Sequence, residues 1–176
     1  MAFEIGIPNV TFKIRIETDI APGFTWKEVP SMDLFKNKRV VLFGLPGAFT
    51  PTCSSTHVPG YDAKFDDIIA KGIDEVYCIS VNDSFTMNAW FKQLGVQNVK
   101  PIPDGSGDFT RSLGMLVKKD NLGFGLRSWR YSALVENGRV TQMFVEQGLQ
   151  DNAESDPFEV SDVYTMLNFL SSEQTS

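Results

Sequence analysis

The sequence of 176 residues contains few of the side chains that catalyse reactions or bind metal ions: two cysteines and one histidine. Two cysteines are too few for the disulfide framework of a small secreted domain. Together with a single histidine they also cannot complete a four-ligand structural zinc site within one chain. Thiol or imidazole chemistry in this chain would therefore use Cys53, Cys78 or His57.

The sequence also lacks an excess of basic residues and any long apolar run. Lys and Arg number 16 against 22 Asp and Glu, a net charge of −6, so phosphate backbones would be repelled and nucleic acid is not an expected partner. No stretch reaches the roughly 20 apolar residues of a membrane span, and charged side chains among the first residues argue against a secretory signal. We expect a soluble, cytoplasmic protein without a membrane partner.

Neither a repeat period nor a linker rich in Pro, Gly and Ser divides the chain. The content of 42% apolar and 22% charged residues is typical of globular proteins. We therefore expect a single domain over residues 1–176, with an ordered core at about 3–170 and a short polar C-terminal tail.

Hydrophobic patterns predict strands at residues 12–17, 25–29, 39–45, 75–81, 99–102, 129–136 and 139–146. They predict helices at residues 31–35, 58–69, 84–94, 108–113 and 163–170. Ser31 and Ser161 are the expected N-caps of the first and last helices, and Pro59 should kink the second. Asn137-Gly138 predicts a two-residue hairpin turn, and the alternating strand of residues 12–17 is expected near one edge of the sheet.

The run at residues 39–45 is apolar without alternation, which is typical of a central parallel strand covered on both faces. With the helices that follow the strands, the order predicts a three-layer α/β fold, a mixed central sheet with helices on both faces. Reactive groups in such folds gather where a strand's carboxyl end leads into a helix N-terminus, and the loop after Leu45 is such a place.

Cys53 lies in or near the first turn of the helix that follows this loop. The unpaired N–H groups and positive dipole end of a helix N-terminus stabilise a thiolate. Thr50, three residues earlier, is close enough to turn its hydroxyl toward the same place. A single cysteine is more often a small buried apolar residue, but the strand-to-helix position favours a reactive role for Cys53.

Cys78 and His57 allow other interpretations. Cys78 lies within an apolar strand and is expected about 10 Å or more from Cys53, beyond the ~7 Å Cα separation of a disulfide. His57, four residues after Cys53, could form a Cys-His pair and make the protein a hydrolase. No third residue identifies itself as the group that would orient His57, which favours a structural histidine.

The segment Pro46-Gly47-Ala48-Phe49-Thr50-Pro51-Thr52-Cys53 fits the peroxiredoxin pattern P-x-x-x-T-x-x-C. The sequence also resembles the peroxiredoxin 5 (type II) subfamily in four further segments, which are residues 54–61, 80–85, 126–132 and 158–161. The resemblance extends from about residue 3 to 170. It implies a thioredoxin-like fold and a thiol-dependent peroxidase that acts in antioxidant defence.

The resemblance also implies the roles of the site residues. Cys53 is the peroxidatic cysteine that attacks hydrogen peroxide or an alkyl hydroperoxide, Thr50 the hydroxyl donor, and Pro46 the residue that shields the pocket. Arg130 is the active-site arginine, with Arg127 as the second candidate; from spacing alone, either could be a solvated charge. The Cys53 sulfenic acid would be reduced by glutathione with glutaredoxin, or by thioredoxin. The resemblance implies that the reaction needs no metal or organic cofactor.

Cys78 matches the resolving cysteine of plant-type members, but its expected distance from Cys53 favours a cycle with one cysteine. The subfamily commonly forms homodimers; Phe49, Phe85 and Trp90 could belong either to the core or to such a subunit contact. Two alternatives to the peroxidase remain: a redox-inert thioredoxin-fold binding module, and a Cys-His hydrolase.

Overall fold

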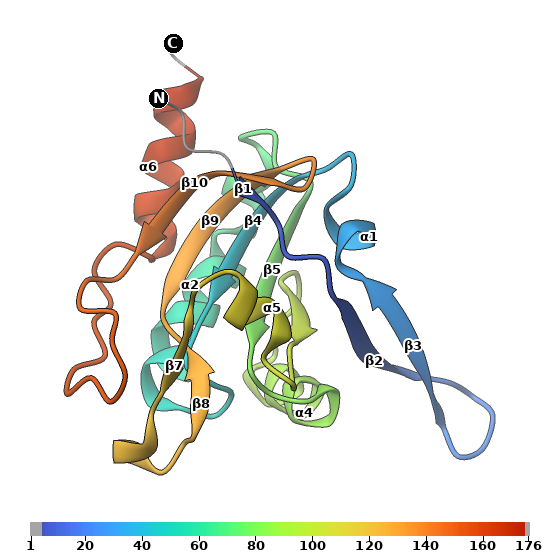
Figure 1. Cartoon of the computed structure of the whole chain (residues 1–176). Helices are drawn as coiled ribbons and strands as arrows, with labels where there is room; N and C mark the ends of the chain where they lie inside the picture. The colour runs from blue at the N-terminus through green and yellow to red at the C-terminus, as the bar shows by residue number, and fades with distance from the viewer. Residues whose placement is uncertain (1–4, 175–176) are drawn as a thin grey trace.

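The computed structural model describes residues 5–174, whose strands form one central sheet and two small two-stranded sheets (Figure 1). In spatial order the central sheet contains β1 (Ile5–Gly6), β10 (Arg139–Val145), β9 (Tyr131–Glu136), β4 (Arg39–Gly44), β5 (Glu75–Ser80) and β6 (Lys100–Pro103). Strands β4, β5 and β6 are parallel, whereas β9 and β10 pair antiparallel. The predicted mixed sheet is confirmed.

Helices cover both faces of this sheet, as predicted. One face packs against η1 (Cys53–His57), α2 (Val58–Ala63), α3 (Phe65–Ile69), α4 (Ser84–Leu94) and α6 (Val163–Glu173). The other packs against α1 (Ser31–Phe35) and α5 (Asp108–Ser112). Successive residues of β4 alternate between the two cores, with Val41 and Phe43 in the first and Val40 and Leu42 in the second. Because both faces are buried, the strand needs apolar residues throughout.

The predicted edge strand lies elsewhere. Strands β2 (Thr11–Glu17) and β3 (Phe24–Pro30) form a hairpin sheet of their own, which stands apart from the central sheet in Figure 1. Phe12 of β2 is buried against Phe109 of α5, with ring centroids 5.7 Å apart, and this contact holds the hairpin against the second core. The edge beside β10 is instead occupied by β1.

Both predicted serine caps are wrong. The Ser31 hydroxyl donates to the carbonyl oxygen of Pro8, and α1 begins without a side-chain cap. The Ser161 hydroxyl donates to the buried carboxylate of Glu146, and Asp162 caps α6 instead. In each case a longer-range hydrogen bond uses the hydroxyl that local sequence assigns to the helix.

The predicted helix at residues 58–69 is divided differently from the prediction. It is preceded by the π-helical turn η1, in which the Val58 N–H donates to the carbonyl oxygen of Cys53. It is also interrupted at Lys64, between α2 and α3. Pro59 lies just after the π-helical turn, so the backbone departs from a regular α-helix beside the residue that was predicted to disturb it.

The predicted hairpin turn is confirmed, since Asn137 and Gly138 join β9 to β10 with φ of 47° and 76°. Two further strands, β7 (Leu116–Lys118) and β8 (Leu126–Ser128), flank the short helix η2 (Asp120–Leu122). Helix α6 extends to Glu173, into the segment predicted as a polar tail. The ends of the predicted domain, residues 1–4 and 175–176, lie outside the described residues. No helix within residues 5–174 is long and apolar enough to cross a membrane.

Candidate active site

Cys53 begins η1, within the first helical turn after the loop that leaves β4, as its position in the sequence predicts. Its side chain is fully buried in the first core. The π-helical turn places one extra residue in the hydrogen-bonded ring, and such turns are frequent at functional sites. The thiol therefore lies inside the protein, where the side chains around it decide its chemistry.

Arg130 reaches this thiol from the segment before β9. Its Nη2 donates to the Cys53 Sγ over 3.4 Å, and only 1% of the residue is exposed. Burial alone would lower the pKa of Arg130, but negative charge at Cys53 and Asp156 outweighs it and raises that pKa above its ordinary value. The guanidinium is therefore a permanent buried cation beside the sulfur.

His57 lies behind Arg130 rather than beside the thiol as a base. Its Nδ1 is 2.9 Å from Arg130 Nη1 and its Nε2 is 3.2 Å from the carbonyl oxygen of Ser161. Burial, together with the charge of Arg130, holds the pKa of His57 well below its ordinary value. A neutral ring that accepts from Arg130 through Nδ1 and donates through Nε2 satisfies both contacts. Both nitrogens are thus occupied, which disfavours the Cys-His hydrolase.

The loop before Cys53 is held by hydrogen bonds at several points. The Thr50 hydroxyl donates to the Gly47 carbonyl oxygen over 2.7 Å, so in this conformation its proton does not face the sulfur and its oxygen remains an acceptor. Pro46 is buried, and its carbonyl oxygen accepts from Arg127 Nη1 over 3.3 Å. Arg127 therefore supports the loop, whereas Arg130 contacts the thiol.

Cys78 lies on β5, directly opposite Phe43 of β4 in the register of the parallel pair. Both cysteines are free and buried in the same core. Burial, and then the negative charge at Cys53, raise the pKa of the Cys78 thiol well above its ordinary value. A thiol that keeps its proton at neutral pH is a poor nucleophile.

Sequence reasoning assigned no site role to two residues, Asp156 and Phe158, although Phe158 begins one of the segments that resemble the subfamily. Asp156 accepts two hydrogen bonds from Arg130, and the centroid of the Phe158 ring lies 5.6 Å from the guanidinium carbon of Arg130. Both lie in the irregular segment of residues 147–162, where no hydrophobic period predicts their position. From sequence alone, an acidic residue in an irregular segment is expected to be a solvated surface charge. The position of Asp156 at the site is evident only from the fold.

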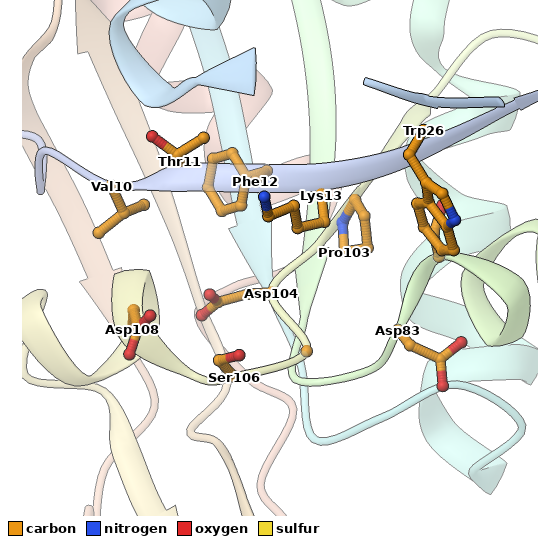
Figure 2. Close-up of a pocket in the computed structure, with 12 residues that line it drawn as sticks. Val10, Thr11, Phe12, Lys13, Trp26, Asp83, Pro103, Asp104, Ser106 and Asp108 are labelled. Carbon is orange, nitrogen blue, oxygen red and sulfur yellow. The ribbon is translucent and has the colours of Figure 1, made fainter. Parts of the chain in front are cut away.

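Two hollows lie in the described part of the chain. A hollow of about 290 Å³ lies between β2 and the segment after β6, with Phe12, Lys13, Trp26 and Asp104 among its lining residues (Figure 2). A second, of about 330 Å³, lies between α2 and the start of α6. Neither is lined by Cys53, Thr50 or Arg130. Within residues 5–174, no group of three or more His, Cys, Asp or Glu side chains could hold a metal ion.

Comparisons with known proteins identify the family. The model of the Redoxin family matches residues 19–167. A peroxiredoxin of Synechocystis sp. is 51% identical over 93% of this chain and 88% of its own. The chain belongs to the peroxiredoxin family.

Solved peroxiredoxin structures have the same fold. The antioxidant protein of Plasmodium falciparum, a 1-Cys peroxiredoxin, has a TM-score of 0.90 at 38% identity and covers 96% of this chain and 98% of its own. Reduced Prx3 of Vibrio vulnificus, solved in complex with hydrogen peroxide, has a TM-score of 0.84 at 37% identity, and the match covers 100% of this chain and 99% of its own. The predicted thioredoxin-like fold is confirmed.

Membership of the family makes this peroxiredoxin a thiol-dependent peroxidase, an oxidoreductase, as the sequence resemblance predicts. It favours the peroxidase over the redox-inert binding module and the hydrolase. The peroxiredoxin pattern, from Pro46 to Cys53, coincides with the loop and first helical turn described above.

Proposed function

We propose that this peroxiredoxin reduces hydrogen peroxide and alkyl hydroperoxides with Cys53 as the peroxidatic cysteine. The observation that carries the proposal is the contact of 3.4 Å between the buried Arg130 guanidinium and the Cys53 sulfur. A fixed cation stabilises the thiolate that attacks peroxide, and a buried site strengthens that interaction. The solved Prx3 of Vibrio vulnificus, which binds hydrogen peroxide, supports this substrate class.

In the proposed reaction the Cys53 thiolate attacks one oxygen of the peroxide along the O–O bond. An S–O bond forms while the O–O bond breaks, sulfur is oxidised to sulfenic acid, and the departing oxygen takes a proton to leave as water or an alcohol. Negative charge moves from sulfur to the departing oxygen. A donor aimed at that charge stabilises the transition state more than the ground state.

Arg130 supplies the main donor in this proposal, and the Cys53 backbone N–H supplies another. Thr50 orients the peroxide through its hydroxyl oxygen, which has lone pairs free to accept from the peroxide O–H. Pro46 shields the site from water, which suits its buried position. Removing one donor of this kind typically lowers the rate by about 10²–10³.

The sulfenic acid is then reduced by thiols from outside the chain. A first thiol forms a mixed disulfide with Cys53 and releases water, and a second thiol restores Cys53 as the disulfide leaves. We assign this role to glutathione with glutaredoxin, or to thioredoxin. The protonated state of Cys78 favours this one-cysteine cycle, which the 1-Cys relative of Plasmodium falciparum also supports.

The matched variants Cys53→Ser and Cys78→Ser test the assignment. We expect Cys53→Ser to abolish peroxide consumption, because no sulfur remains to accept the oxygen, and Cys78→Ser to keep most of it. Both variants are tested by measuring peroxide consumption with excess thiol and by measuring the protein mass after one addition of peroxide. Equal loss of activity in the two variants would overturn the one-cysteine cycle.

We also propose that the enzyme forms a homodimer in the cytoplasm. Trp26 and Phe85, which are exposed, and Phe24, which is partly buried, form an aromatic patch with ring centroids 5.5–6.2 Å from one another. Half of the Trp26 and Phe85 side chains is exposed, and such patches mark interaction sites. The reducing cytoplasm would supply the thiols that the cycle needs.

A further inference from the structure

Asp156 is the charged residue of the site to which neither the peroxiredoxin pattern nor the proposed reaction assigns a role. Its Oδ1 accepts from Arg130 Nε over 3.2 Å, and its Oδ2 accepts from Arg130 Nη2 over 2.8 Å. Arg130 is buried, whereas the Asp156 side chain is 38% exposed. The pair thus extends from the buried sulfur toward the surface.

The geometry of this pair fixes where the guanidinium points. A guanidinium is planar, so two parallel hydrogen bonds from Nε and Nη2 define both its plane and its rotation. The same Nη2 donates to the Cys53 sulfur, and Nη1 contacts the His57 ring. Asp156 therefore holds the Nε–Nη2 edge of the guanidinium, which includes the nitrogen that contacts the Cys53 sulfur, and His57 holds Nη1.

Asp156 is itself held in place, although its segment is irregular. The buried Glu146 carboxylate accepts the backbone N–H groups of Glu159, Val160 and Ser161. The Phe158 ring packs against both His57 and Arg130, with centroid distances of 4.8 and 5.6 Å. These anchors begin two residues after Asp156, so its carboxylate approaches Arg130 from a fixed backbone.

We propose that Asp156 is a positioning residue for peroxide reduction, whose carboxylate holds the Arg130 guanidinium in line with the Cys53 sulfur. Asp156 touches neither the thiol nor the peroxide, and it acts through Arg130. The inference rests on the proposed function, in which Arg130 stabilises the charge that develops during O–O cleavage. Because a donor is effective only when it is aimed at that charge, its orientation matters as much as its presence.

Asp156→Asn, Asp156→Glu and the control Glu154→Gln test this inference. Asp156→Asn keeps the shape of the side chain but presents an amide, which cannot accept two guanidinium hydrogen bonds in parallel. We expect the rate constant of Cys53 oxidation by peroxide to fall about 10- to 100-fold, as for other residues that orient a reacting group. Asp156→Glu retains a carboxylate and should recover most of the rate. Glu154→Gln removes an exposed charge from the same segment and should stay within about twofold of the wild type.

Alkylation of Cys53 by iodoacetamide separates positioning from damage to the site. Alkylation needs the thiolate, which Arg130 also stabilises, but it needs no donor at an O–O bond, so Asp156→Asn should lose more of its peroxide rate than of its alkylation rate. Thermal unfolding checks that each variant is folded, and Asp156→Ser, which also lacks the carboxylate, replaces Asp156→Asn should that variant not fold.

Three results would overturn the inference: a wild-type peroxide rate in Asp156→Asn, an equal loss in Asp156→Glu and Asp156→Asn, or parallel losses of oxidation and alkylation. Cys53→Ser separates this failure from that of the proposed function. Peroxide turnover in Cys53→Ser would overturn the function itself. An inactive Cys53→Ser beside a fast Asp156→Asn would overturn only the role of Asp156.

Discussion

His57 is neutral within the folded protein because it is buried against the Arg130 guanidinium. In the unfolded chain the same ring would titrate near its ordinary value of about 6.5. Its folded pKa is the lower of the two, so as the pH falls below about 6.5 the unfolded state takes up the proton first. Acid therefore stabilises the unfolded state relative to the folded one, and His57 makes the free energy of unfolding fall.

We predict that His57→Gln removes this part of the pH dependence. Between about pH 6.5 and 5.5 the wild type should lose about 1 kcal/mol of unfolding free energy through His57, whereas His57→Gln should lose less. The variant should be less stable near pH 7, since its packing against Phe43 and its hydrogen bonds change. Urea unfolding of both proteins at several pH values measures the difference. Parallel pH curves would contradict the burial of a neutral ring.

The site residues differ in how far the sequence predicts them. The strand-to-helix position identifies Cys53 from local pattern alone. The spacing of Arg127 and Arg130 does not decide which of the two lies at the active site, and the resemblance selects Arg130. In the structure Arg127 donates to loop carbonyl oxygens, whereas Arg130 contacts the Cys53 sulfur. Asp156 is brought to Arg130 by long-range packing, which carries no local signal.

At the scale of elements, the end of β4 is closely packed against the neighbouring strand β9. Gly44 lies opposite Tyr131 of β9, and a Cβ at residue 44 would lie 2.3 Å from a carbon of that fully buried ring. Only glycine fits beside the ring, immediately before the loop that leads to Cys53. The packing of two strands thus fixes where this loop begins.

Gly44→Ala should destabilise the protein by about 1–3 kcal/mol, because the added methyl group overpacks the core. Gly6→Ala is the control, since a Cβ at residue 6 of β1 meets no atom within 4 Å. Urea unfolding of the two variants measures the contrast. Equal stabilities would mean that the Tyr131 ring moves aside without penalty.

Most elements of four or more residues were predictable, and the shortest strands were not. The apolar runs of β4 and β5 and the Asn137-Gly138 turn are strong local signals, and each is confirmed. Strands β7 and β8 have three residues each, too few to show alternation, and were missed. The π-helical turn at Cys53 also leaves no pattern in the sequence, since it changes the register by a single residue.

At the scale of the whole molecule, the proposed homodimer depends on the aromatic patch of Phe24, Trp26 and Phe85. The Arg15 guanidinium stacks over the Phe24 and Phe85 rings at 4.5 and 4.9 Å and holds them together. The patch is linked to the active-site loop, because Asn82, just before α4, accepts from the Ala48 N–H. An interface there would border the loop before Cys53.

Phe85→Glu should therefore shift the protein toward the monomer, because a carboxylate would have to lose its water inside the interface. Leu122→Glu, at an exposed apolar side chain of η2, is the control and should leave the dimer intact. Sedimentation velocity over a range of concentrations measures both. A wild type that stays monomeric at every concentration would overturn the homodimer.

The contact between Trp90 and Ser54 has a practical consequence. The fully buried indole of Trp90 donates through Nε1 to the Ser54 hydroxyl over 2.9 Å, one residue after Cys53. Indole emission responds to the polarity and hydrogen bonding of its surroundings, so rearrangement of the first turn after oxidation would change its intensity or wavelength. The protein thus carries its own optical probe, and each turnover could be followed by intrinsic fluorescence without a label.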